Sequence, residues 1–214
     1  MNSFLTVNGL PTGDAIGQRL RSDSVKKVIN FCLGPPGTNI GQAAQKWSEE
    51  IGITDKTKIV WCDTPEAALE AALKVEHGTL GIFWTCAVYY RLHELFFNNP
   101  GTLPFFINYT MPLDAMQLAT RLEKVTEVND SVPANWKIAS HPSPAPLMTG
   151  WEIQLVNSNT AASEACAKGR VDACITTEAG RVNSDLVKIH EFGSPPMVFF
   201  GGITSDGARL LSQA

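Results

Sequence analysis

Short apolar runs alternate along the chain with polar segments whose ends carry helix start and stop signals. The run at residues 28–33 is followed by the glycine- and proline-rich turn 34–39 and then by a helical pattern over residues 40–51. Asp63 or Thr64, with Pro65 after it, is typical of a helix start, and Gly78 of a stop. The first half of the chain further predicts strands at 58–62, 80–84 and 103–109 and a helix at 87–97.

The same alternation continues through the second half of the chain. It predicts strands at 136–139, 152–156, 171–176, 187–192 and 197–200. It predicts helical segments at 111–122, in a short proline-broken stretch from Ser140, from the cap 157–159 to Gly169, and from Asp206. Strands that alternate with helices indicate an α/β fold with mostly parallel sheets. Residues 1–27 lack sustained periodicity and are expected to form an N-terminal arm with a short helix near residues 15–20.

Composition and charge narrow the classes of protein that fit this pattern. The chain has 44% hydrophobic and 18% charged residues, as expected for a folded domain with a core. Its net charge of −4 lacks the basic excess that nucleic-acid binding needs. The longest apolar stretch, residues 80–90, is shorter than the roughly 20 residues that span a bilayer. The first residues carry no signal-peptide pattern. We therefore expect no nucleic-acid or membrane partner and a cytoplasmic location.

The cysteines and the glycine-rich turn point away from metal and nucleotide chemistry. Five scattered cysteines, with no CxxC pair and no histidine at ligand spacing, predict buried reduced thiols and no metal site; they are Cys32, Cys62, Cys86, Cys166 and Cys174. The turn 34–38 is followed by no Gly-Lys-Ser/Thr, so it is not a Walker A loop, and it lacks the third glycine of a dinucleotide fingerprint. No cofactor is expected.

Three junctions between a strand and a helix share a hydroxyl side chain. Thr38, Ser140 and Ser158 each lie at or near a predicted helix start, where backbone N–H groups favour an anion. A single such hydroxyl is most simply an N-cap. All three would lie at the carboxyl ends of strands, which is where open α/β sheets bind their ligands. The set therefore predicts a site for a small anionic molecule held by neutral donors.

Two titratable residues lie at the same strand ends. His141 follows Ser140, with no carboxylate near it in the sequence, and has either a chemical role or only a role in shaping the loop. Glu178 follows the strand that ends at Thr177. It is either an acid that faces the ligand or a first-turn residue favoured by the helix dipole.

Four segments occur in the order and approximate spacing seen in prephenate dehydratase domains. They are Gly34-Pro35-Pro36-Gly37-Thr38 with Gln42-Ala43-Ala44, Ser140-His141-Pro142, Asn157-Ser158-Asn159-Thr160-Ala161-Ala162, and Thr177-Glu178-Ala179. The chain resembles this family from about Val28 to Ile203. It is most similar to the non-aromatising prephenate decarboxylases of the bacilysin type, through residues 140–144, 155–158 and 196–197.

The resemblance implies a fold and a division of the chain. The family fold consists of two α/β lobes, like a type II periplasmic binding protein, with the ligand in the cleft between the lobes. We accordingly expect residues 28–105 in lobe 1, residues 106–189 in lobe 2, and residues 190–214 returning to lobe 1 after the arm 1–27.

Two departures from the dehydratase pattern bear on activity. Dehydratases carry Thr-Arg-Phe in the last strand, where this chain has residues 196–200, Pro-Met-Val-Phe-Phe. The decarboxylases share that loss, so the resemblance implies no aromatising dehydration. After the third strand, dehydratases have Pro-Ile-Glu-Asn and the bacilysin enzyme has Pro-His, where this chain has Trp84-Thr85-Cys86. This second departure bears on the identity of the substrate rather than on the fold.

The resemblance implies a carbon–carbon lyase that decarboxylates prephenate to dihydro-4-hydroxyphenylpyruvate in antibiotic or other natural-product biosynthesis. The expected catalytic residues are Glu178, His141 and Arg91. The expected substrate-binding residues are Thr38, Trp84, Thr85, Ser140, Asn157, Ser158, Met197 and Phe199, with no metal and no cofactor. Trp84, Met197 and Phe199 would form an apolar wall that desolvates the ring carboxylate.

Two other functions fit the same residues. One is a non-catalytic protein that binds a small anion on this fold, because fold does not fix function. The other is residual dehydratase activity, which would give phenylpyruvate. The expected partner in every case is a small-molecule dicarboxylate, and a homodimer is a candidate assembly.

Overall fold

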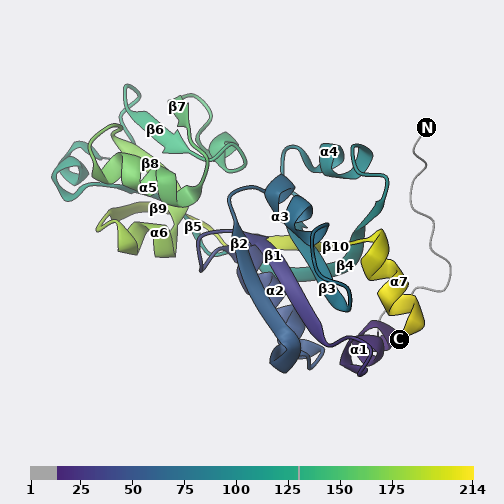
Figure 1. The fold of residues 1–214 in the computed structure, drawn as a ribbon. Coiled ribbons are helices and arrows are strands. Elements are labelled where there is room, and N and C mark those ends of the chain that lie inside the picture. Colours follow the sequence, from purple (N-terminus) through teal and green to yellow (C-terminus); the bar gives the residue numbers. More distant parts are fainter. Residues whose placement is uncertain (1–13, 130) are drawn as a thin grey trace. The chain divides into compact units, whose positions relative to one another are not determined.

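The computed structural model describes residues 14–129 and 131–214, and its helices and strands form two compact units (Figure 1). Unit 1 comprises the chain up to Met111 together with Met197–Ala214, and unit 2 comprises Pro112–Pro196. Unit 2 is thus inserted into unit 1, and the chain passes between the units twice. None of the helices in the described ranges is both long and apolar enough to cross a lipid bilayer.

Unit 1 is built on a five-stranded sheet. Its strands are β1 (Lys27–Leu33), β2 (Thr57–Cys62), β3 (Thr79–Cys86), β4 (Thr102–Pro112) and β10 (Pro196–Thr204). Its helices are α1 (Asp14–Arg21), α2 (Asn39–Glu50), α3 (Pro65–Ala72), α4 (Leu92–Phe97) and α7 (Ser205–Gln213), with a 3-10 turn η1 (Thr54–Lys56).

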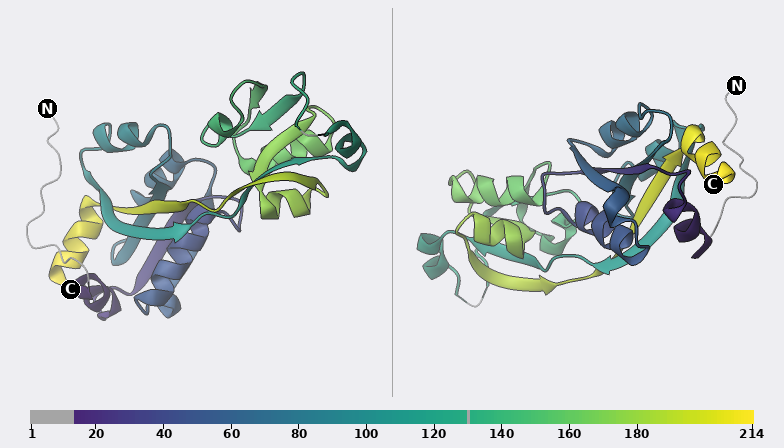
Figure 2. Two further views of the ribbon diagram at one scale, coloured as in Figure 1. Left: turned by 180° about the vertical axis from the view of Figure 1, so that it is seen from behind. Right: turned by 60° about the horizontal axis from the view of Figure 1, so that its bottom comes forward.

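The unit 1 sheet has the order β2-β1-β3-β10-β4 and is mixed rather than wholly parallel. Strands β2 and β3 both pair with β1 in parallel, and β10 runs antiparallel to β3. Figure 2 shows β10 and β4 side by side as long strands. Three parallel strands therefore end at one edge of this sheet, and the last strand returns from unit 2 to complete it.

Both faces of the unit 1 sheet are covered. On one face, Phe31 and Phe83 pack with Ala68, Leu69 and further apolar residues of α3 and α4. Helix α2 packs against β1 and β3 with its tryptophan Trp47. Burial on both faces is the reason that β3 reads as a continuous apolar run rather than an alternating one.

Unit 2 has a second five-stranded sheet of order β7-β6-β8-β5-β9. Its strands are β5 (Met116–Thr120), β6 (Lys137–Ser140), β7 (Glu152–Leu155), β8 (Ala173–Thr177) and β9 (Val187–Gly193). Its helices are α5 (Asn159–Ala167) and α6 (Glu178–Asn183), with 3-10 segments η2 (Leu122–Glu127) and η3 (Ala145–Met148). Strands β7 and β8 flank β6 in parallel, whereas β5 is antiparallel to β8 and β9.

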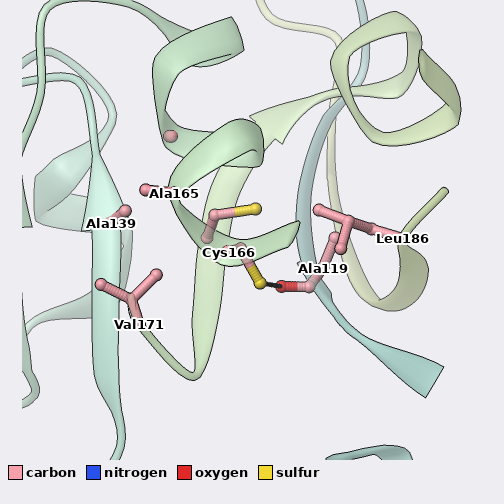
Figure 3. Close-up of a cluster of buried hydrophobic side chains, with 8 residues drawn as sticks. Ala119, Ala139, Ala165, Cys166, Val171 and Leu186 are labelled. Atoms are coloured by element: carbon pink, nitrogen blue, oxygen red, sulfur yellow. Dashed lines mark hydrogen bonds between the residues drawn. The ribbon is translucent and has the colours of Figure 1, made fainter. Parts of the chain in front are cut away.

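Unit 2 also buries both faces of its sheet. Helix α5 covers one face with small side chains, so that Cys166 packs among Ala119, Ala139 and Val171 (Figure 3). The thiol of Cys166 donates to the carbonyl oxygen of Ala119 at 3.9 Å. The other face is packed with larger side chains, among them Trp136. Small residues under α5 let the helix approach the sheet closely, which places its N-terminus beside the strand ends.

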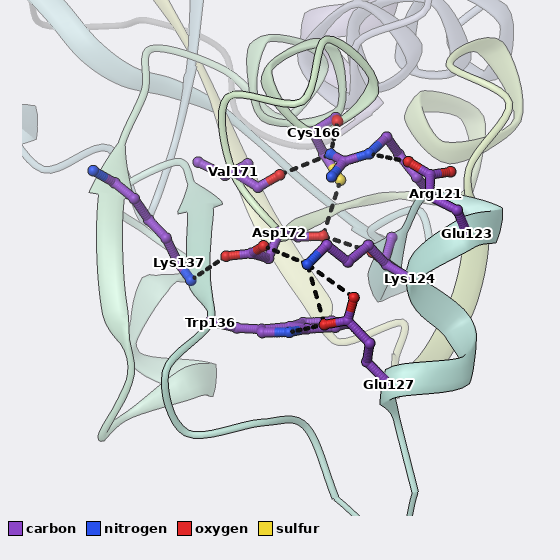
Figure 4. Close-up of polar contacts among 10 residues, drawn as sticks. Arg121, Glu123, Lys124, Glu127, Trp136, Lys137, Cys166, Val171 and Asp172 are labelled. Atoms are coloured by element: carbon purple, nitrogen blue, oxygen red, sulfur yellow. Dashed lines mark hydrogen bonds and ion pairs between the residues drawn. The ribbon is translucent and has the colours of Figure 1, made fainter.

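A polar network ties η2 to the start of β8 and the end of α5 (Figure 4). The Arg121 guanidinium donates to the carbonyl oxygens of Cys166 and Val171, the latter at 2.8 Å. The Lys124 ammonium lies 3.2 Å from the Asp172 carboxylate, which also accepts the backbone N–H of Lys137 at 2.9 Å. These contacts hold the end of unit 2 opposite to the carboxyl ends of β6, β7 and β8.

Most of the predicted elements are confirmed. The cap predicted for the third helix is present: Thr64 Oγ1 accepts the N–H of Ala67, and Pro65 is the first helical residue. The short helix expected in the arm is α1, which is not detached, because Arg19 donates to the carbonyl of Leu211 in α7. The rest of the arm, residues 1–13, lies outside the described residues.

Two predicted helices are wrong in type or length. Residues 111–122 contain the end of β4 and all of β5 rather than a helix. Every residue of β5 is buried, including the polar Gln117 and Thr120, so the segment is not the continuous apolar run that identifies a fully buried strand. The helix expected at 87–97 is confined to Leu92–Phe97.

The expected lobe boundaries after residues 105 and 189 fall inside β4 and β9, whereas the contacts divide the chain after Met111 and Pro196.

Candidate functional site

The strongest candidate site is the carboxyl edge of the unit 2 sheet, formed by the ends of β6, β7 and β8 and the residues that follow them; we call it the unit 2 edge. Ser140 ends β6 directly beside Leu155 of β7, and the N–H of Val156 donates to the Ser140 carbonyl at 2.9 Å. Strand β8 flanks β6 on the other side and ends at Thr177. Open α/β sheets bind ligands at such an edge.

Two helices begin at the unit 2 edge, and both have a hydroxyl as N-cap. The Oγ of Ser158 accepts the N–H of Ala161 at 3.0 Å, and Oγ1 of Thr177 accepts the N–H of Gly180 at 3.2 Å. Accepting these bonds leaves each hydroxyl its own hydrogen to donate. The prediction that residues 157–159 cap a helix is therefore confirmed. The N-terminus of α5 also brings its partial positive charge to this edge.

Ser140 and His141 lie at the centre of the unit 2 edge. Ser140 is fully buried, and its hydroxyl donates to the carbonyl of His141 at 2.8 Å. The Nδ1 of His141 accepts the N–H of Ser143 at 3.3 Å, so the hydrogen of the neutral ring is on Nε2. Burial lowers the pKa of His141 below its ordinary 6.5, which keeps the ring neutral at pH 7. His141 thus offers a neutral N–H donor.

Three further residues shape this edge, and the sequence reading did not select them as site residues. Thr176 is buried and donates from Oγ1 to the carbonyl of Asn159 at 2.9 Å, which ties β8 to the start of α5. The Oδ1 of Asn159 is buried and has no hydrogen-bond partner within the described part of the chain. Gly180 lets α6 pack closely, because a Cβ there would lie 2.4 Å from Thr176 Oγ1. The sequence signal that could have indicated these residues was the pair Thr176-Thr177 at the end of the strand.

The other two residues expected in this part of the site lie on its surface. Asn157 is exposed. Glu178 is the first residue of α6, its side chain is 63% exposed, and its carboxylate lies 3.7 Å from the Arg181 guanidinium. The backbone N–H of Glu178 donates to the carbonyl of Ala115 at 3.1 Å. Glu178 therefore lies beside the predicted donors but carries a neighbouring counter-ion.

The corresponding edge of unit 1 contains the glycine-rich turn. Thr38 is the residue before α2, but its hydroxyl donates back to the carbonyl of Leu33 at 2.7 Å and makes no cap bond to the helix. Gly34 and Gly41 are required by Trp61, because a Cβ at either position would come within 2.3 Å of its indole ring. Packing of this indole accounts for both glycines without a phosphate ligand.

Trp84, Met197 and Phe199, expected as an apolar wall, are buried in unit 1. The indole Nε1–H of Trp84 donates to Oδ1 of Asn30 at 2.9 Å, and the ring packs edge-on against Trp47 with centroids 5.6 Å apart. The contacts described for Trp84 are thus core contacts, and its role as a ligand wall stays a prediction.

Thr85, which follows Trp84 in the chain, is buried like Trp84 but differs from it in the hydrogen bonding of its side chain. Thr85 is 2% exposed, and its Oγ1 has no hydrogen-bond partner among the residues that the structure describes. A buried hydroxyl without a partner costs roughly 1–3 kcal/mol of stability. Among the site residues expected in unit 1, Thr85 is therefore the one with a buried hydroxyl whose hydrogen bond the described residues do not supply.

Arg91 was expected to supply a cation. It lies just before α4, where its guanidinium donates from Nε to Glu94 at 2.9 Å and lies 3.5 Å from the Glu66 carboxylate. The pairing of Arg91 with Glu94 also lowers the pKa of that carboxyl group. Two carboxylates thus neutralise Arg91 within unit 1.

The structure therefore brings five of the predicted residues together at the unit 2 edge and places the other six in unit 1. The five are Ser140, His141, Asn157, Ser158 and Glu178. In the described ranges, no group of three or more histidine, cysteine, aspartate or glutamate side chains could hold a metal ion. The five cysteines are unpaired thiols.

Comparison with known proteins supports the fold but no closer relationship. No protein-family model matches the chain, and no curated protein matches its sequence. Among solved structures, a lipoprotein of Bacillus subtilis assigned to methionine binding has a TM-score of 0.53 at 13% identity, over 88% of this chain and 89% of that one. The periplasmic VFT2 domain of Bordetella pertussis BvgS has a TM-score of 0.52 at 15% identity, over 95% and 90%.

A histidine kinase sensor domain similar to periplasmic binding proteins has a TM-score of 0.51 at 14% identity, over 90% of this chain and 88% of that one. The chain spans only 64% of the length of the quorum-quenching acylase GqqA, with 11% identity and a TM-score of 0.47. The likenesses to the lipoprotein, the VFT2 domain and the sensor domain establish the fold class: the protein has the two-lobed α/β fold of periplasmic-binding-protein-like domains, with mixed sheets.

Proposed function

We propose that this protein binds a small molecule with carboxylate groups at the unit 2 edge and acts on it as a carbon–carbon lyase. One observation carries the proposal. Three of the four segments that resemble prephenate dehydratase domains, around Ser140, Ser158 and Thr177, meet at this edge. They follow three different strands, and a shared ligand would explain why these motifs and this edge coincide.

The donors at the unit 2 edge suit a carboxylate. Ser158 and Thr177 have hydroxyl hydrogens to donate, and His141 has Nε2–H, so all three donors are neutral. The α5 N-terminus adds a partial positive charge. Neutral donors bind an anion without the desolvation penalty of a buried cation, and each net bond contributes about 0.5–1.5 kcal/mol.

The reaction we propose is the decarboxylation of prephenate without aromatisation. The bond between the ring carbon and its carboxylate breaks, CO₂ leaves, and the electron pair moves into the ring diene. A ring carbon then takes up a proton, and the ring hydroxyl is retained. The product is dihydro-4-hydroxyphenylpyruvate, and the step needs no oxidant or reductant. The absence of Thr-Arg-Phe from β10 supports retention of the hydroxyl.

A second function, binding without catalysis, is favoured by the charged candidates themselves. Glu178 lies beside Arg181, and Arg91 is paired with Glu94 and Glu66, so each of these two charged side chains already has a counter-ion within the chain. Decarboxylation requires that Glu178, His141 or a bound water supply the proton. Turnover therefore separates the two functions.

The deciding experiment is incubation of the purified protein with prephenate. CO₂ release and product absorbance are followed against a control without protein, because prephenate also decays spontaneously. Protein-dependent CO₂ with a non-aromatic keto acid supports the lyase, and phenylpyruvate would restore dehydration. A raised melting temperature without turnover supports the binding protein. If prephenate causes neither turnover nor a raised melting temperature, it is refuted as the ligand.

The site itself is tested by removing one donor. Ser158→Gly keeps most of the capping effect, because glycine at an N-cap costs only about a few tenths of a kcal/mol relative to serine. We expect the affinity for prephenate to fall about ten-fold, or roughly 1.4 kcal/mol. Thr204→Gly is the matched control, since Thr204 caps α7 in the same way but lies in unit 1. Equal affinity in both variants would refute the assignment of Ser158.

We also propose a cytoplasmic location. The five thiols, all unpaired in the structure, support it because cytosolic thiols stay reduced. Fractionation of cells that express the full-length chain checks this, and recovery from an oxidising compartment would refute it.

A further inference from the structure

Thr176 places a buried hydroxyl on a strand face that is otherwise packed with small apolar side chains. It lies two residues beyond Cys174 in β8, so both side chains point toward α5, where Cys174 packs among alanines. The side chain of Thr176 is fully buried, and its Oγ1 donates to the backbone carbonyl of Asn159 at 2.9 Å. Asn159 is the first residue of α5, the helix that Ser158 caps. A single hydroxyl of β8 thus bonds to the start of that helix.

The short segment that carries Ser158 is held at both of its ends. At one end the N–H of Val156 donates to the carbonyl of Ser140 in β6 at 2.9 Å. At the other end Thr176 holds the carbonyl of Asn159. Ser158 lies between these two anchors and is one of the neutral donors proposed for the ligand. The position of its hydroxyl therefore depends on the strand ends on both sides.

The space around the Thr176 hydroxyl is closely filled. A Cβ on Gly180 of α6 would lie 2.4 Å from Thr176 Oγ1 and 3.5 Å from Ser163 Oγ of α5. Ser163 is also fully buried, and its hydroxyl donates to the carbonyl of Thr160 at 2.9 Å. The hydroxyl of Thr176 therefore lies where β8, α5 and α6 meet, and glycine at position 180 leaves the room that this hydroxyl needs.

We infer that Thr176 is a positioning residue for ligand binding at the unit 2 edge. Its hydroxyl bonds to the backbone of Asn159 and thereby holds the neighbouring Ser158 hydroxyl toward the ligand. Filling the space alone would be served as well by valine, which has the shape of threonine and no buried polar atom to satisfy. This inference rests on the function proposed for the unit 2 edge, because it concerns how that edge holds its ligand.

Thr120 offers a matched control in the same unit. It is also a fully buried threonine of a strand, and its Oγ1 donates to the backbone carbonyl of Asp172 at 2.6 Å. Thr120 pairs with Ala173, the first residue of β8, so it lies at the end of the sheet opposite to the unit 2 edge. Thr176→Val and Thr120→Val thus remove the same kind of bond from opposite ends of one sheet.

The test compares the half-saturating concentration of prephenate in full-length variants, measured as KM if the protein turns prephenate over and as Kd if it only binds. A net hydrogen bond corresponds to about a three- to ten-fold change in affinity, so Thr176→Val should bind prephenate more weakly by that factor. Thr120→Val should bind as the wild type does, although the melting temperature should fall in both variants. Thr176→Ser keeps the hydroxyl and loses a buried methyl group, so its melting temperature should fall while its affinity is retained.

Two outcomes would overturn the inference. One is a Thr176→Val variant with the affinity of the wild type, and the other is an equal loss of affinity in Thr120→Val, which would make the effect one of general stability. Gly180→Ala repeats the test if Thr176→Val fails to fold. Its added Cβ displaces the Thr176 hydroxyl, so the affinity should fall even though alanine is the better helix former, and an unchanged affinity would count against the inference.

Hydrogen exchange of the unliganded chain separates this inference from the proposed function. In Thr176→Val the backbone N–H of Ala161, which Ser158 caps, should exchange faster, whereas in Thr120→Val its rate should not change. If the wild type binds no prephenate, the proposed ligand fails and exchange alone decides the inference. Faster exchange confined to Thr176→Val supports Thr176 as the anchor of α5, and the same rate in both variants overturns it.

Discussion

Replacing Asn30 tests whether Trp84 belongs to the core of unit 1 or to a ligand site. Asn30 is fully buried; its Oδ1 accepts the Trp84 indole N–H at 2.9 Å, and its Nδ2 donates to Ser48 Oγ at 3.1 Å. Asn30→Leu keeps the size of the side chain but removes both bonds. Ser48 retains its bond to the carbonyl of Ala44, whereas the indole N–H has no acceptor.

The expected loss follows from these contacts. An orphaned buried N–H costs roughly 1–3 kcal/mol and a lost net hydrogen bond about 0.5–1.5 kcal/mol, so Asn30→Leu should lower the unfolding free energy by about 2–4 kcal/mol. In a chain of this length, each kcal/mol shifts the melting temperature by about 2–4 °C, which gives a decrease of roughly 5–15 °C.

The assay is urea and thermal unfolding of Asn30→Leu, Trp84→Phe and the double variant, followed by circular dichroism. Because Trp84→Phe removes the orphaned donor, the double variant should be more stable than the sum of the single losses predicts, by at least about 1 kcal/mol. Additive losses would refute the described hydrogen bond. A Trp84→Phe protein of normal stability with weakened prephenate binding would restore Trp84 to the ligand site.

Three other changes test separate parts of the structure. Thr85→Val removes a buried hydroxyl without a partner, so calorimetry should find stability unchanged or raised by about 1–2 kcal/mol; a loss would mean that the hydroxyl has a partner. Burial raises the pKa of Asp172, but the Lys137 N–H and the Lys124 ammonium outweigh it and lower the pKa. Its stabilising effect is therefore present above the unfolded pKa of about 3.9 and is lost as the pH falls below it. Asp172→Asn should accordingly be less stable at pH 7 and lose less on acidification, and an unchanged pH profile in urea unfolding would contradict this. Arg121→Met removes donors to two backbone carbonyls, one at the end of α5 and one just before β8, and should lower the unfolding free energy by about 2 kcal/mol, whereas an unchanged urea midpoint would contradict that role.

The sequence predicted those elements whose signals are local. Thr64 with Pro65 and Ser158 are caps that bond within one turn, so the residue types alone identify the helix starts. Strand β5 was missed because its neighbours on both sides and both faces bury all of it, and no local pattern records that burial. The strand therefore became visible only through its pairing with β8 and β9.

The site could be predicted only in part for the same reason. The alternation of strands and helices predicted that Ser140 and Ser158 lie at the carboxyl ends of strands, and both do, whereas Thr38, the third residue of that set, lies in unit 1. The partners of side chains were not predicted, because they come from distant segments. The sequence gives no reason for glycine at positions 34 and 41, and the reason becomes visible only when Trp61 of the next strand is seen to fill the space beside both. Arg91 reads as a free cation until Glu66 of α3 is placed next to it.

The pairing of Arg91 also bears on how the proposed decarboxylation would proceed. A cation held against the departing carboxylate stabilises the ground state more than the transition state, in which negative charge moves into the ring, and so would raise the barrier. An enzyme that gains rate by desolvating that carboxylate must keep cations away from it and hold the substrate by its other polar groups. Neutral donors at Ser158, Thr177 and His141 meet this requirement, whereas an Arg91 already neutralised by two carboxylates is better suited to fixing α4. The pairing that argues against Arg91 as a catalytic residue therefore agrees with the proposed reaction. Non-aromatising decarboxylation at the unit 2 edge would require that Arg91 not face the departing carboxylate.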